Sequence, residues 1–409
     1  MTALLIAADW VVPITQPMVQ DGAVVVDESG TILAVGEADE LRRVYPSAPE
    51  RRVHGALLPG LVNAHTHVEL SALAGMVPGG EGLVAWVQKL MPLAKGLAAE
   101  QKQDAMRAAA QALFDAGTAA VGDVGNGLQA VAALGTQPLQ GTFFHELLGS
   151  ADSVHSDVLA AARSEHEAMK GANAWPQRFA YVQAPHAPYS ASPRLLQRLF
   201  ASAAARGERT TIHAAEDADE IALLVHGKGQ WPAVLNRLGV PAGERTPQQR
   251  PVPYLAQQGA FAGAHPCALV HMTEADTEDI NAAAKAHAPI VLCPRSNLHI
   301  GAALPPVKRF IEANMTLAIG TDSLASNKSL SLWDEMAELS HQFPDVPGQH
   351  WLQAATLGGA HVLNRPWLGS LAVGKRPGLL GVRLAASQDT LLSTLTSRPP
   401  SNISWVVEP

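Results

Sequence analysis

The stretch Leu57 to Leu70, LLPGLVNAHTHVEL, decides how the fold is interpreted. Its apolar run is bounded by Pro59-Gly60 and leads directly to His65 and His67, which is typical of a buried strand. Because successive side chains of a strand point to opposite faces, the two histidines should share one face. Two imidazoles side by side can bind one metal ion. Chance alone gives roughly 0.6 His-x-His pairs at this histidine content, so the pair needs partners elsewhere.

Seven further short apolar runs follow this one, and Ala/Leu-rich helical stretches separate them. The runs cover residues 118–124, 141–147, 179–185, 210–215, 268–272, 289–294 and 317–322. Eight strand–helix units predict an α/β fold of the (β/α)8 TIM-barrel type. Parallel strands buried on both faces should be nearly continuous apolar runs, as these are. The expected helices include residues 98–116, 153–170, 193–206, 276–286 and 305–314.

β-rich segments flank this region at both ends of the chain. Residues 22–27 and 31–36 are short β-branched runs around a Glu-Ser-Gly turn, which predicts a hairpin. The tail turns β-like again after about residue 368. We therefore expect residues 57–365 to form the barrel, and residues 1–56 and 366–409 to form a small β-sandwich domain together. The long connection over residues 217–267 should shape the substrate pocket.

The composition limits the class of partner. The chain has 409 residues, 47% of them hydrophobic, and a net charge of −8 that is spread along the sequence. This excludes a basic surface for nucleic acid or an anionic membrane, and we expect a small-molecule partner. Cys267 and Cys293 are the only cysteines, which fits a reducing cytoplasm. We expect no signal peptide and no membrane span; a homo-oligomer remains open.

Polar residues end most of the apolar runs, and the active site of a TIM barrel lies at the C-terminal ends of its strands. Four nitrogen and oxygen donors should converge there: His65, His67, His213 and Asp322. This set suits one divalent ion, Zn²⁺ or alternatively Fe²⁺, with one position left for water.

Two more residues have the chemistry to act beside such an ion. Glu216 lies three residues after His213, close enough to transfer a proton, and His271 is placed to orient a water or polarise the substrate. Other interpretations remain open. Asp322 could cap a helix, Glu216 could be a solvated carboxylate at a helix start, and a lone histidine is more often structural than a ligand.

Taken together, these motifs resemble the amidohydrolase superfamily. The marks are PGLVNAHTH, HAAE at 213–216, VHM at 270–272 and GTDS at 320–323, and the resemblance covers essentially the whole chain. Binuclear members place a lysine at the end of the fourth strand, where this chain has Gln-Ala-Pro-His at 183–186, so the resemblance implies one metal ion. APHAPYS at 184–190 and CPRSN at 293–297 are similar to the mononuclear aminohydrolases that act on purines and related rings.

Within that branch, HTHVELSALAG followed by Trp86 and GTDSLASN is most similar to the 6-aminodeoxyfutalosine deaminases of menaquinone synthesis. The resemblance implies hydrolytic deamination of an adenosine-type nucleoside. Glu216 would move the proton of a metal-activated water to the ring, while Asp322 and His271 hold that water. The alternatives are an S-adenosylhomocysteine/methylthioadenosine or guanine deaminase, another hydrolysis on a ring substrate, and a non-catalytic scaffold.

Candidate substrate contacts lie near these motifs: Glu69, Ser71, Trp86, Glu146, His186, Arg295, Asn297 and Ser323. Arg295 could bind a carboxylate on the 5′ extension of the nucleoside or make a structural salt bridge. Trp86 could stack on the ligand or be buried by its helix. Glu146 and its neighbour His145 could contact the substrate or form a buried pair.

Overall fold

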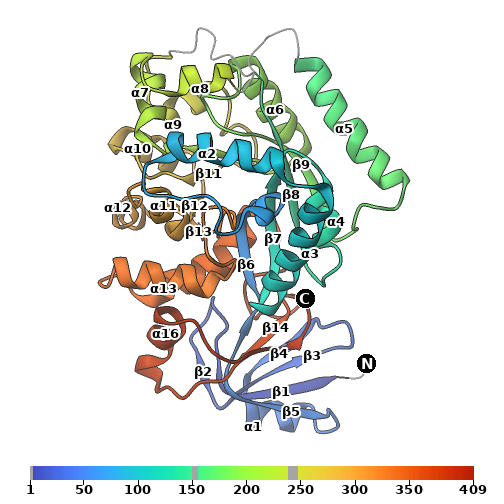
Figure 1. The fold of residues 1–409 in the computed structure, drawn as a ribbon. Helices are drawn as coiled ribbons and strands as arrows, with labels where there is room; N and C mark the ends of the chain where they lie inside the picture. The colour runs from blue at the N-terminus through green and yellow to red at the C-terminus, as the bar shows by residue number, and fades with distance from the viewer. Residues whose placement is uncertain (1–2, 150–154, 238–246) are drawn as a thin grey trace.

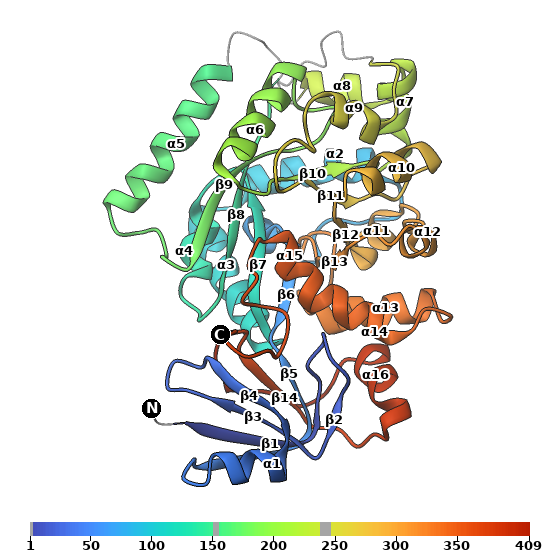
Figure 2. The same ribbon diagram turned by 180° about the vertical axis from the view of Figure 1, so that it is seen from behind.

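Eight parallel strands form the centre of the fold, each from one of the expected apolar runs (Figures 1 and 2). The computed structural model describes residues 3–149, 155–237 and 247–409. One four-stranded sheet contains β6 (Leu61–Thr66), β7 (Thr118–Gly125), β8 (Gln140–Leu147) and β9 (Phe179–Pro185). The other contains β10 (Thr211–Ala214), β11 (Ala268–His271), β12 (Ile290–Leu292) and β13 (Leu317–Ile319).

Short backbone contacts join the two sheets at both seams. The main-chain N–H groups of Thr321 and Asp322 donate to the carbonyl of His65, both at 3.1 Å, and the N–H of His213 donates to the carbonyl of His186 at 3.0 Å. The parallel eight-strand arrangement is therefore confirmed. A continuously hydrogen-bonded barrel stays a prediction, because the strands pair as two sheets of four.

Helices follow the strands and cover the outside of the two sheets (Figure 1). They are η1 (Val68–Leu73), α2 (Leu83–Gly96), α3 (Ala99–Asp115), α4 (Gln129–Leu134), α5 (His155–Gly171), α6 (Pro193–Arg206), α7 (Ala218–His226), α8 (Trp231–Arg237), α9 (Pro251–Gln257), α10 (Thr277–Lys285), α11 (Pro294–Ile300), α12 (Val307–Glu312), α13 (Leu332–Gln342), α14 (Gly348–Gln353), η2 (Ala354–Gly358) and α15 (Gly359–Val362). The five expected helices are present, although the first two residues expected of α5 lie outside the described residues. None of the helices that the structure describes is long and apolar enough to cross a membrane.

The long connection after β10 is more ordered than a loop. Its described residues form α7, α8 and α9, while residues 238–246 lie outside the described part of the chain. Asp217 starts α7 by accepting a hydrogen bond from the N–H of Glu220, and Gly227 ends it in the left-handed conformation. Cap residues therefore divide the described part of the connection into helices, and its role in shaping the substrate pocket stays a prediction.

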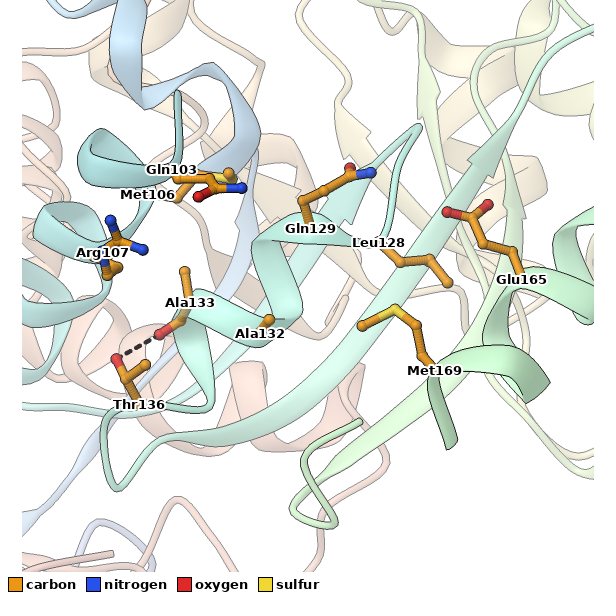
Figure 3. Close-up of a pocket in the computed structure, with 10 residues that line it drawn as sticks. All are labelled: Gln103, Met106, Arg107, Leu128, Gln129, Ala132, Ala133, Thr136, Glu165 and Met169. Atoms are coloured by element: carbon orange, nitrogen blue, oxygen red, sulfur yellow. Dashed lines mark hydrogen bonds between the residues drawn. The ribbon is translucent and has the colours of Figure 1, made fainter. Parts of the chain in front are cut away.

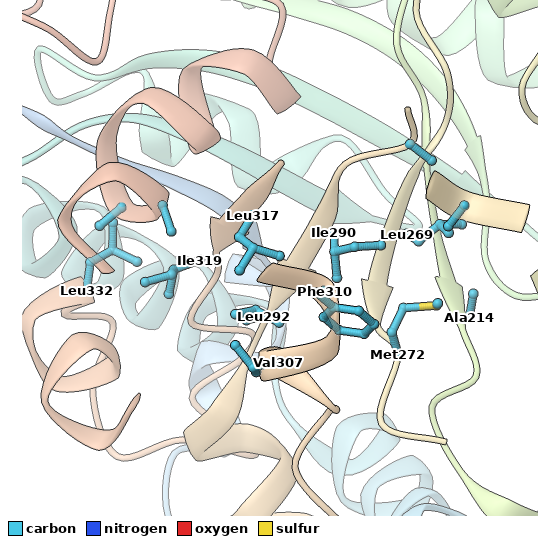
Figure 4. Packing of buried hydrophobic residues seen from close by; sticks show 14 of the residues in the cluster. Ala214, Leu269, Met272, Ile290, Leu292, Val307, Phe310, Leu317, Ile319 and Leu332 are labelled. Carbon is cyan, nitrogen blue, oxygen red and sulfur yellow. The ribbon is translucent and has the colours of Figure 1, made fainter. Parts of the chain in front are cut away.

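The main apolar core lies between the second sheet and its helices (Figure 4). Leu269, Ile290 and Leu292 project from the strands towards Val307 and Phe310 of α12, and all five are buried. Burying a side chain of this size typically contributes about 1.5–3 kcal/mol each. This packing fixes the strands whose C-terminal ends carry the site.

Both ends of the chain meet in one separate sheet below the parallel strands (Figure 1). It contains β1 (Leu4–Val11), β2 (Val19–Gln20), β3 (Gly22–Val26), β4 (Ile32–Glu37), β5 (Glu50–Pro59), β14 (Leu379–Val382) and β15 (Ile403–Val407), with α1 (Ala38–Val44) and α16 (Gln388–Ser397) connecting strands. The hairpin of β3 and β4 is confirmed. The sandwich is not, because the described strands of both ends form a single seven-stranded sheet.

The opening apolar run is two strands and not one. Residues up to Pro59 belong to β5 of the terminal sheet, and β6 begins at Leu61. Gly60 separates them at a crowded point, where a Cβ would lie 2.6 Å from the Cβ of Ala119 and 2.9 Å from the carbonyl of Pro377. The expected boundary between residues 56 and 57 therefore falls inside β5, because the chain passes from one sheet to the next almost without a loop.

Candidate active site

Three histidines from two sheets converge at the C-terminal ends of the strands. His65 is the next-to-last residue of β6, His67 comes directly after this strand, and His213 lies in β10. The ring centre of His65 is 4.8 Å from that of His67 and 5.0 Å from that of His213. The Nε2 atoms of His67 and His213 are 3.3 Å apart. One ligand nitrogen from each ring lies within 4.8 Å of the others, so the predicted convergence is confirmed.

His65 has the environment of a metal ligand. Its side chain is fully buried, and neither ring nitrogen has a hydrogen-bond partner among the described residues. Buried polar atoms in folded proteins are almost always bonded, so an unpartnered imidazole needs an explanation. Burial, together with the neighbouring histidines, holds the pKa of His65 well below its usual value. The ring is therefore neutral and offers a lone pair to a cation.

A backbone carbonyl selects the tautomer of His213. The Nδ1 atom lies 2.9 Å from the carbonyl oxygen of His186, which can only accept a hydrogen bond. Nδ1 therefore carries the hydrogen, and the lone pair of Nε2 faces His67. Glu146, His186 and His213 also come within 4.8 Å of one another. Nδ1 of His213 donates to a carbonyl and therefore has no free lone pair for a second metal ion next to Glu146. The cluster thus favours a single metal ion.

Asp322 lies beside the histidine cluster. Its Oδ1 lies 3.8 Å from Nε2 of His67, and its Oδ2 accepts hydrogen bonds from the hydroxyls of Ser296 and Ser326. Burial raises the pKa of Asp322, but His67, His271 and Ser296 outweigh it, so the pKa lies below its usual value. The helix-cap interpretation is wrong, because the next helix, α13, starts ten residues later with Ser331 at its N-cap.

Glu216 and His271 lie together beside the histidine cluster. Oε1 of Glu216 is 3.4 Å from Nε2 of His271, and Nδ1 of His271 bonds to Oδ1 of Asn297 at 2.9 Å. Glu216 is 8% exposed, and burial raises its pKa to about 8. It is therefore not a solvated carboxylate at a helix start, and it can hold a proton at neutral pH.

Backbone strain marks the same strand ends. Ala215, His271, Met272 and Asp322 all have positive φ values between 49° and 71°. Residues with side chains rarely adopt this conformation, and such strain concentrates at functional sites. Glu220 supports one of these turns, because its carboxylate accepts hydrogen bonds from the N–H groups of Ala215 and Glu216 at 3.1 and 2.8 Å.

Several predicted substrate contacts lie near the cluster. Oε1 of Glu146 is 3.6 Å from Nδ1 of His213, and His186 packs beside that ring while its own Nδ1 bonds to Ser190. Burial raises the pKa of Glu146 to about 6 and that of Glu69 to about 7. The carboxylate of Glu69 accepts hydrogen bonds from the main chain just after β7.

Ser71 and Trp86 are both buried. Their polar side-chain atoms, Oγ and Nε1, have no hydrogen-bond partner within the part of the chain that the structure describes. Trp86 packs in an apolar cluster around α2, which agrees with the interpretation that the helix buries it. Stacking of Trp86 on a ligand stays a prediction.

Three of the predicted substrate contacts have protein partners. Arg295 makes an ion pair with Asp334 at 3.3 Å and a hydrogen bond to Ser329, which is the structural salt bridge that the sequence left open. Asn297 holds His271, and the N–H of Ser323 donates to Asp322. These contacts give Asn297 and Ser323 a supporting position, and their substrate roles stay predictions.

Several residues that support the cluster from other elements were not predicted from the sequence: Asn63, Asn126, Glu220, Ser296 and Ser326. Ser296 lies inside the CPRSN motif, and Ser326 follows GTDS by three residues. The two motifs therefore indicated where these supporting serines could be found. Asn126 belongs to none of the quoted motifs. Its hydrogen-bond partners lie in η1 and β8, which are distant from it in the sequence.

Gly320, in the GTDS motif, has no room for a side chain. A Cβ at this position would lie 2.6 Å from the Cβ and 2.7 Å from the carbonyl oxygen of His65. We expect Gly320→Ala to cost about 1–3 kcal/mol by overpacking and to weaken metal binding by moving His65. Thermal unfolding and metal content measure the two effects. Gly96→Ala, at the end of α2 with nothing within 4 Å, is the control; equal stability of both variants would contradict this account.

A surface groove lies apart from the histidine cluster (Figure 3). It has a volume of about 450 Å³ between α3, α4 and α5, and its lining includes Met106, Arg107, Leu128, Glu165 and Met169. None of the predicted site residues lines it. We therefore place the candidate active site at the histidine cluster and not in this groove.

Comparison with known proteins agrees with the geometry. An aminodeoxyfutalosine deaminase of Deinococcus radiodurans is 33% identical over 353 residues, which cover 84% of this chain and 81% of that protein. A 5-methylthioadenosine/S-adenosylhomocysteine deaminase of Nitratidesulfovibrio vulgaris is 28% identical over 382 residues, 90% of this chain and 80% of that protein.

A solved structure of a deaminase has a similar fold. Helicobacter pylori aminofutalosine deaminase in complex with methylthio-coformycin has a TM-score of 0.86 to this chain at 25% identity, with 97% of this chain and 96% of that chain covered. The sequence profile of the amidohydrolase family matches residues 56–402, which include every residue of the cluster. This chain belongs to the amidohydrolase family.

Proposed function

We propose that this chain deaminates an adenosine-type nucleoside by hydrolysis, with 6-aminodeoxyfutalosine as its preferred substrate. The chain is a hydrolase that acts on C–N bonds, as its family and its relatives indicate. The observation that carries the proposal is the buried His65 ring, whose two unpartnered nitrogens stand beside His67 and His213. The substrate is supported by the names of the similar deaminases of D. radiodurans and H. pylori.

The donor set fits one divalent ion. His65, His67, His213 and Asp322 supply three imidazoles and one carboxylate, which suits Zn²⁺ and, as an alternative, Fe²⁺. When bound, such an ion polarises a water molecule and lowers its pKa towards neutrality. The serines on Asp322 and the carbonyl on His213 fix the orientation of the ligands before the ion arrives.

The chain's own residues then move the protons. Glu216 takes a proton from the attacking water and delivers it to the ring nitrogen next to the carbon that bears the amino group. Burial raises the pKa of Glu216, which favours its holding the proton from water until the ring nitrogen receives it. His271, held by Asn297, orients the water together with Asp322. The ring carbon gains the oxygen of water and loses ammonia, which leaves an inosine-like product.

The remaining parts of the proposal follow from the family resemblance. The two four-stranded sheets work as one barrel within residues 57–365, of which residues 57–59 still belong to β5 of the terminal sheet, and residues 1–56 and 366–409 form the companion domain. A deaminase of 6-aminodeoxyfutalosine would serve menaquinone synthesis in the cytoplasm.

A second candidate activity is deamination of methylthioadenosine or S-adenosylhomocysteine, which the similarity to the N. vulgaris enzyme favours. Both candidates share the adenine ring and ribose and differ only in the 5′ substituent. Arg295, the cation proposed for a 5′ carboxylate, is paired with Asp334 and would have to leave this partner.

An ammonia-release assay separates these activities. The purified chain would be incubated with 6-aminodeoxyfutalosine, methylthioadenosine, S-adenosylhomocysteine, adenosine and guanine, and kcat/KM compared. We expect the highest value for 6-aminodeoxyfutalosine and none for guanine. A higher value for methylthioadenosine would favour the second candidate, and activity confined to guanine would overturn the adenosine-type proposal.

A further inference from the structure

Asn126 joins two carboxyl groups that belong to different elements. It follows the last residue of β7 and is exposed at the C-terminal ends of the strands. Its main-chain N–H donates to Oε1 of Glu69 at 3.2 Å, and the N–H of Gly127 donates to Oε2 of Glu69 at 3.4 Å. The side-chain Nδ2 donates to Oε2 of Glu146 at 3.2 Å and to the carbonyl of Glu146 at 3.1 Å. One residue therefore orients both carboxylates.

The second oxygen of Glu146 lies beside the histidine cluster. Oε1 is buried and has no hydrogen-bond partner among the residues that the structure describes. It lies 3.6 Å from Nδ1 of His213, whose hydrogen is already donated to the carbonyl of His186. A buried carboxylate oxygen is rarely left without a donor. A donor from a bound ligand would satisfy it.

The chemistry of this pair restricts the ligand group. Carboxylate oxygens only accept hydrogen bonds, so the facing group must donate, as a hydroxyl does. A phosphate or carboxylate would be repelled by Glu69 and Glu146 together. Both carboxylates contact Asn126, and Glu146 also lies beside His213, so the pair can accept from two neighbouring hydroxyls of one sugar.

We infer that Asn126 is a positioning residue that holds Glu69 and Glu146 as a paired acceptor for the ribose hydroxyls of the substrate. The inference rests on the proposed function, because it takes the substrate to be a ribonucleoside. The main-chain N–H of Asn126 holds Glu69 and its side chain holds Glu146, so side-chain variants release Glu146 alone. They should affect binding of the sugar and not the hydrolytic step at the ring.

A buried chain of side chains fixes Asn126 from behind. Nε2 of His145 lies 3.1 Å from the carbonyl oxygen of Asn126, and Nδ1 lies 3.0 Å from the hydroxyl of Tyr181. Because a carbonyl only accepts, Nε2 of His145 carries a hydrogen and donates it to Asn126. His145 therefore holds the main chain of Asn126, which accounts for a histidine next to Glu146.

Deoxynucleosides test this assignment. The wild-type chain should deaminate adenosine with a kcat/KM at least about 10-fold above those of 2′-deoxyadenosine and 3′-deoxyadenosine, since each lacks one hydroxyl donor. Asn126→Ala should lower kcat/KM for adenosine by about 10-fold through KM, with kcat and metal content unchanged. Its preference for adenosine over the deoxynucleosides should shrink to within about threefold.

Two further variants keep the test decisive. Asn126→Asp keeps the size and the main-chain N–H, but it places a carboxylate against Glu146, so it should reduce the ribose preference at least as much as Asn126→Ala. Gln129→Ala changes an exposed amide nearby for which no bond to either carboxylate is found in the described chain, and it should keep the wild-type preference.

The outcomes separate this inference from the proposed function. If both Asn126 variants keep the wild-type ribose preference while the wild type is active on adenosine, the inference fails and the proposed function stands. If the wild type releases ammonia from guanine but from no adenosine-type nucleoside, the proposed function itself fails.

Discussion

Glu216→Gln should reduce the kcat of ammonia release by about 10²–10⁴-fold, the contribution typical of a well-placed proton-transferring carboxyl group. The amide has the same size and can keep the contact with His271, which is 3.4 Å away in the wild type. It cannot take a proton from water and deliver it to the ring nitrogen. Because Glu216 is not one of the four donors proposed for the metal, the variant should bind metal as the wild type does.

Metal analysis and kcat measured on the same preparation check this prediction. Glu278→Gln, which changes an exposed carboxyl on α10, is the matched control and should retain wild-type turnover. A Glu216→Gln variant with full metal content and near-normal kcat would show that another group moves the proton. A variant that had lost its metal would show that Glu216 is a ligand.

His65→Ala should remove both the metal and the activity. The ring of His65 stands within 6 Å of the rings of His67, His213 and His271, centre to centre, and it is fully buried. Changes to residues that only support metal ligands already cost about 10–100-fold, so loss of a ligand should exceed about 100-fold in metal affinity or turnover.

Thermal unfolding with and without zinc provides a second readout for His65→Ala. An ion that binds only the folded state raises the melting temperature of the wild type, and it should raise that of the variant far less. His54→Ala, an exposed histidine of β5, is the control and should show the wild-type response to zinc. An equal response of His65→Ala and the wild type would exclude His65 from the metal site.

The eight central strands could be predicted because burial on both faces leaves a local signature. The run from Thr118 to Gly125 is buried at every position, and its apolar composition reflects this directly. The boundary at Gly60 could not be predicted, since it depends on contacts with Ala119 and Pro377, which are distant in sequence. The single sheet formed by both ends could not be predicted for a similar reason, because pairing between strands distant in sequence is set by tertiary packing.

The donor cluster could also be predicted, because strand ends in a parallel sheet meet at one edge. His65, His213 and Asp322 each end a recognisable apolar run, so their convergence follows from the topology. The supporting residues could not be found in this way. Asn126 and Glu220 have no distinctive spacing, and their roles depend on hydrogen bonds whose partners only folding brings into reach. Arg295 was considered for a substrate contact because of its place at a strand end. Its ion pair with Asp334 could not be predicted, because Asp334 comes from a different element.

The central claim is that one divalent ion, held by His65, His67, His213 and Asp322, is required for deamination. Titration of the metal-free chain with zinc, while ammonia release from 6-aminodeoxyfutalosine is followed, tests it most directly. The account predicts negligible activity without metal and a linear rise that levels off at one equivalent of zinc per chain. A rise that continues to two equivalents, or full activity of the metal-free chain, would contradict it.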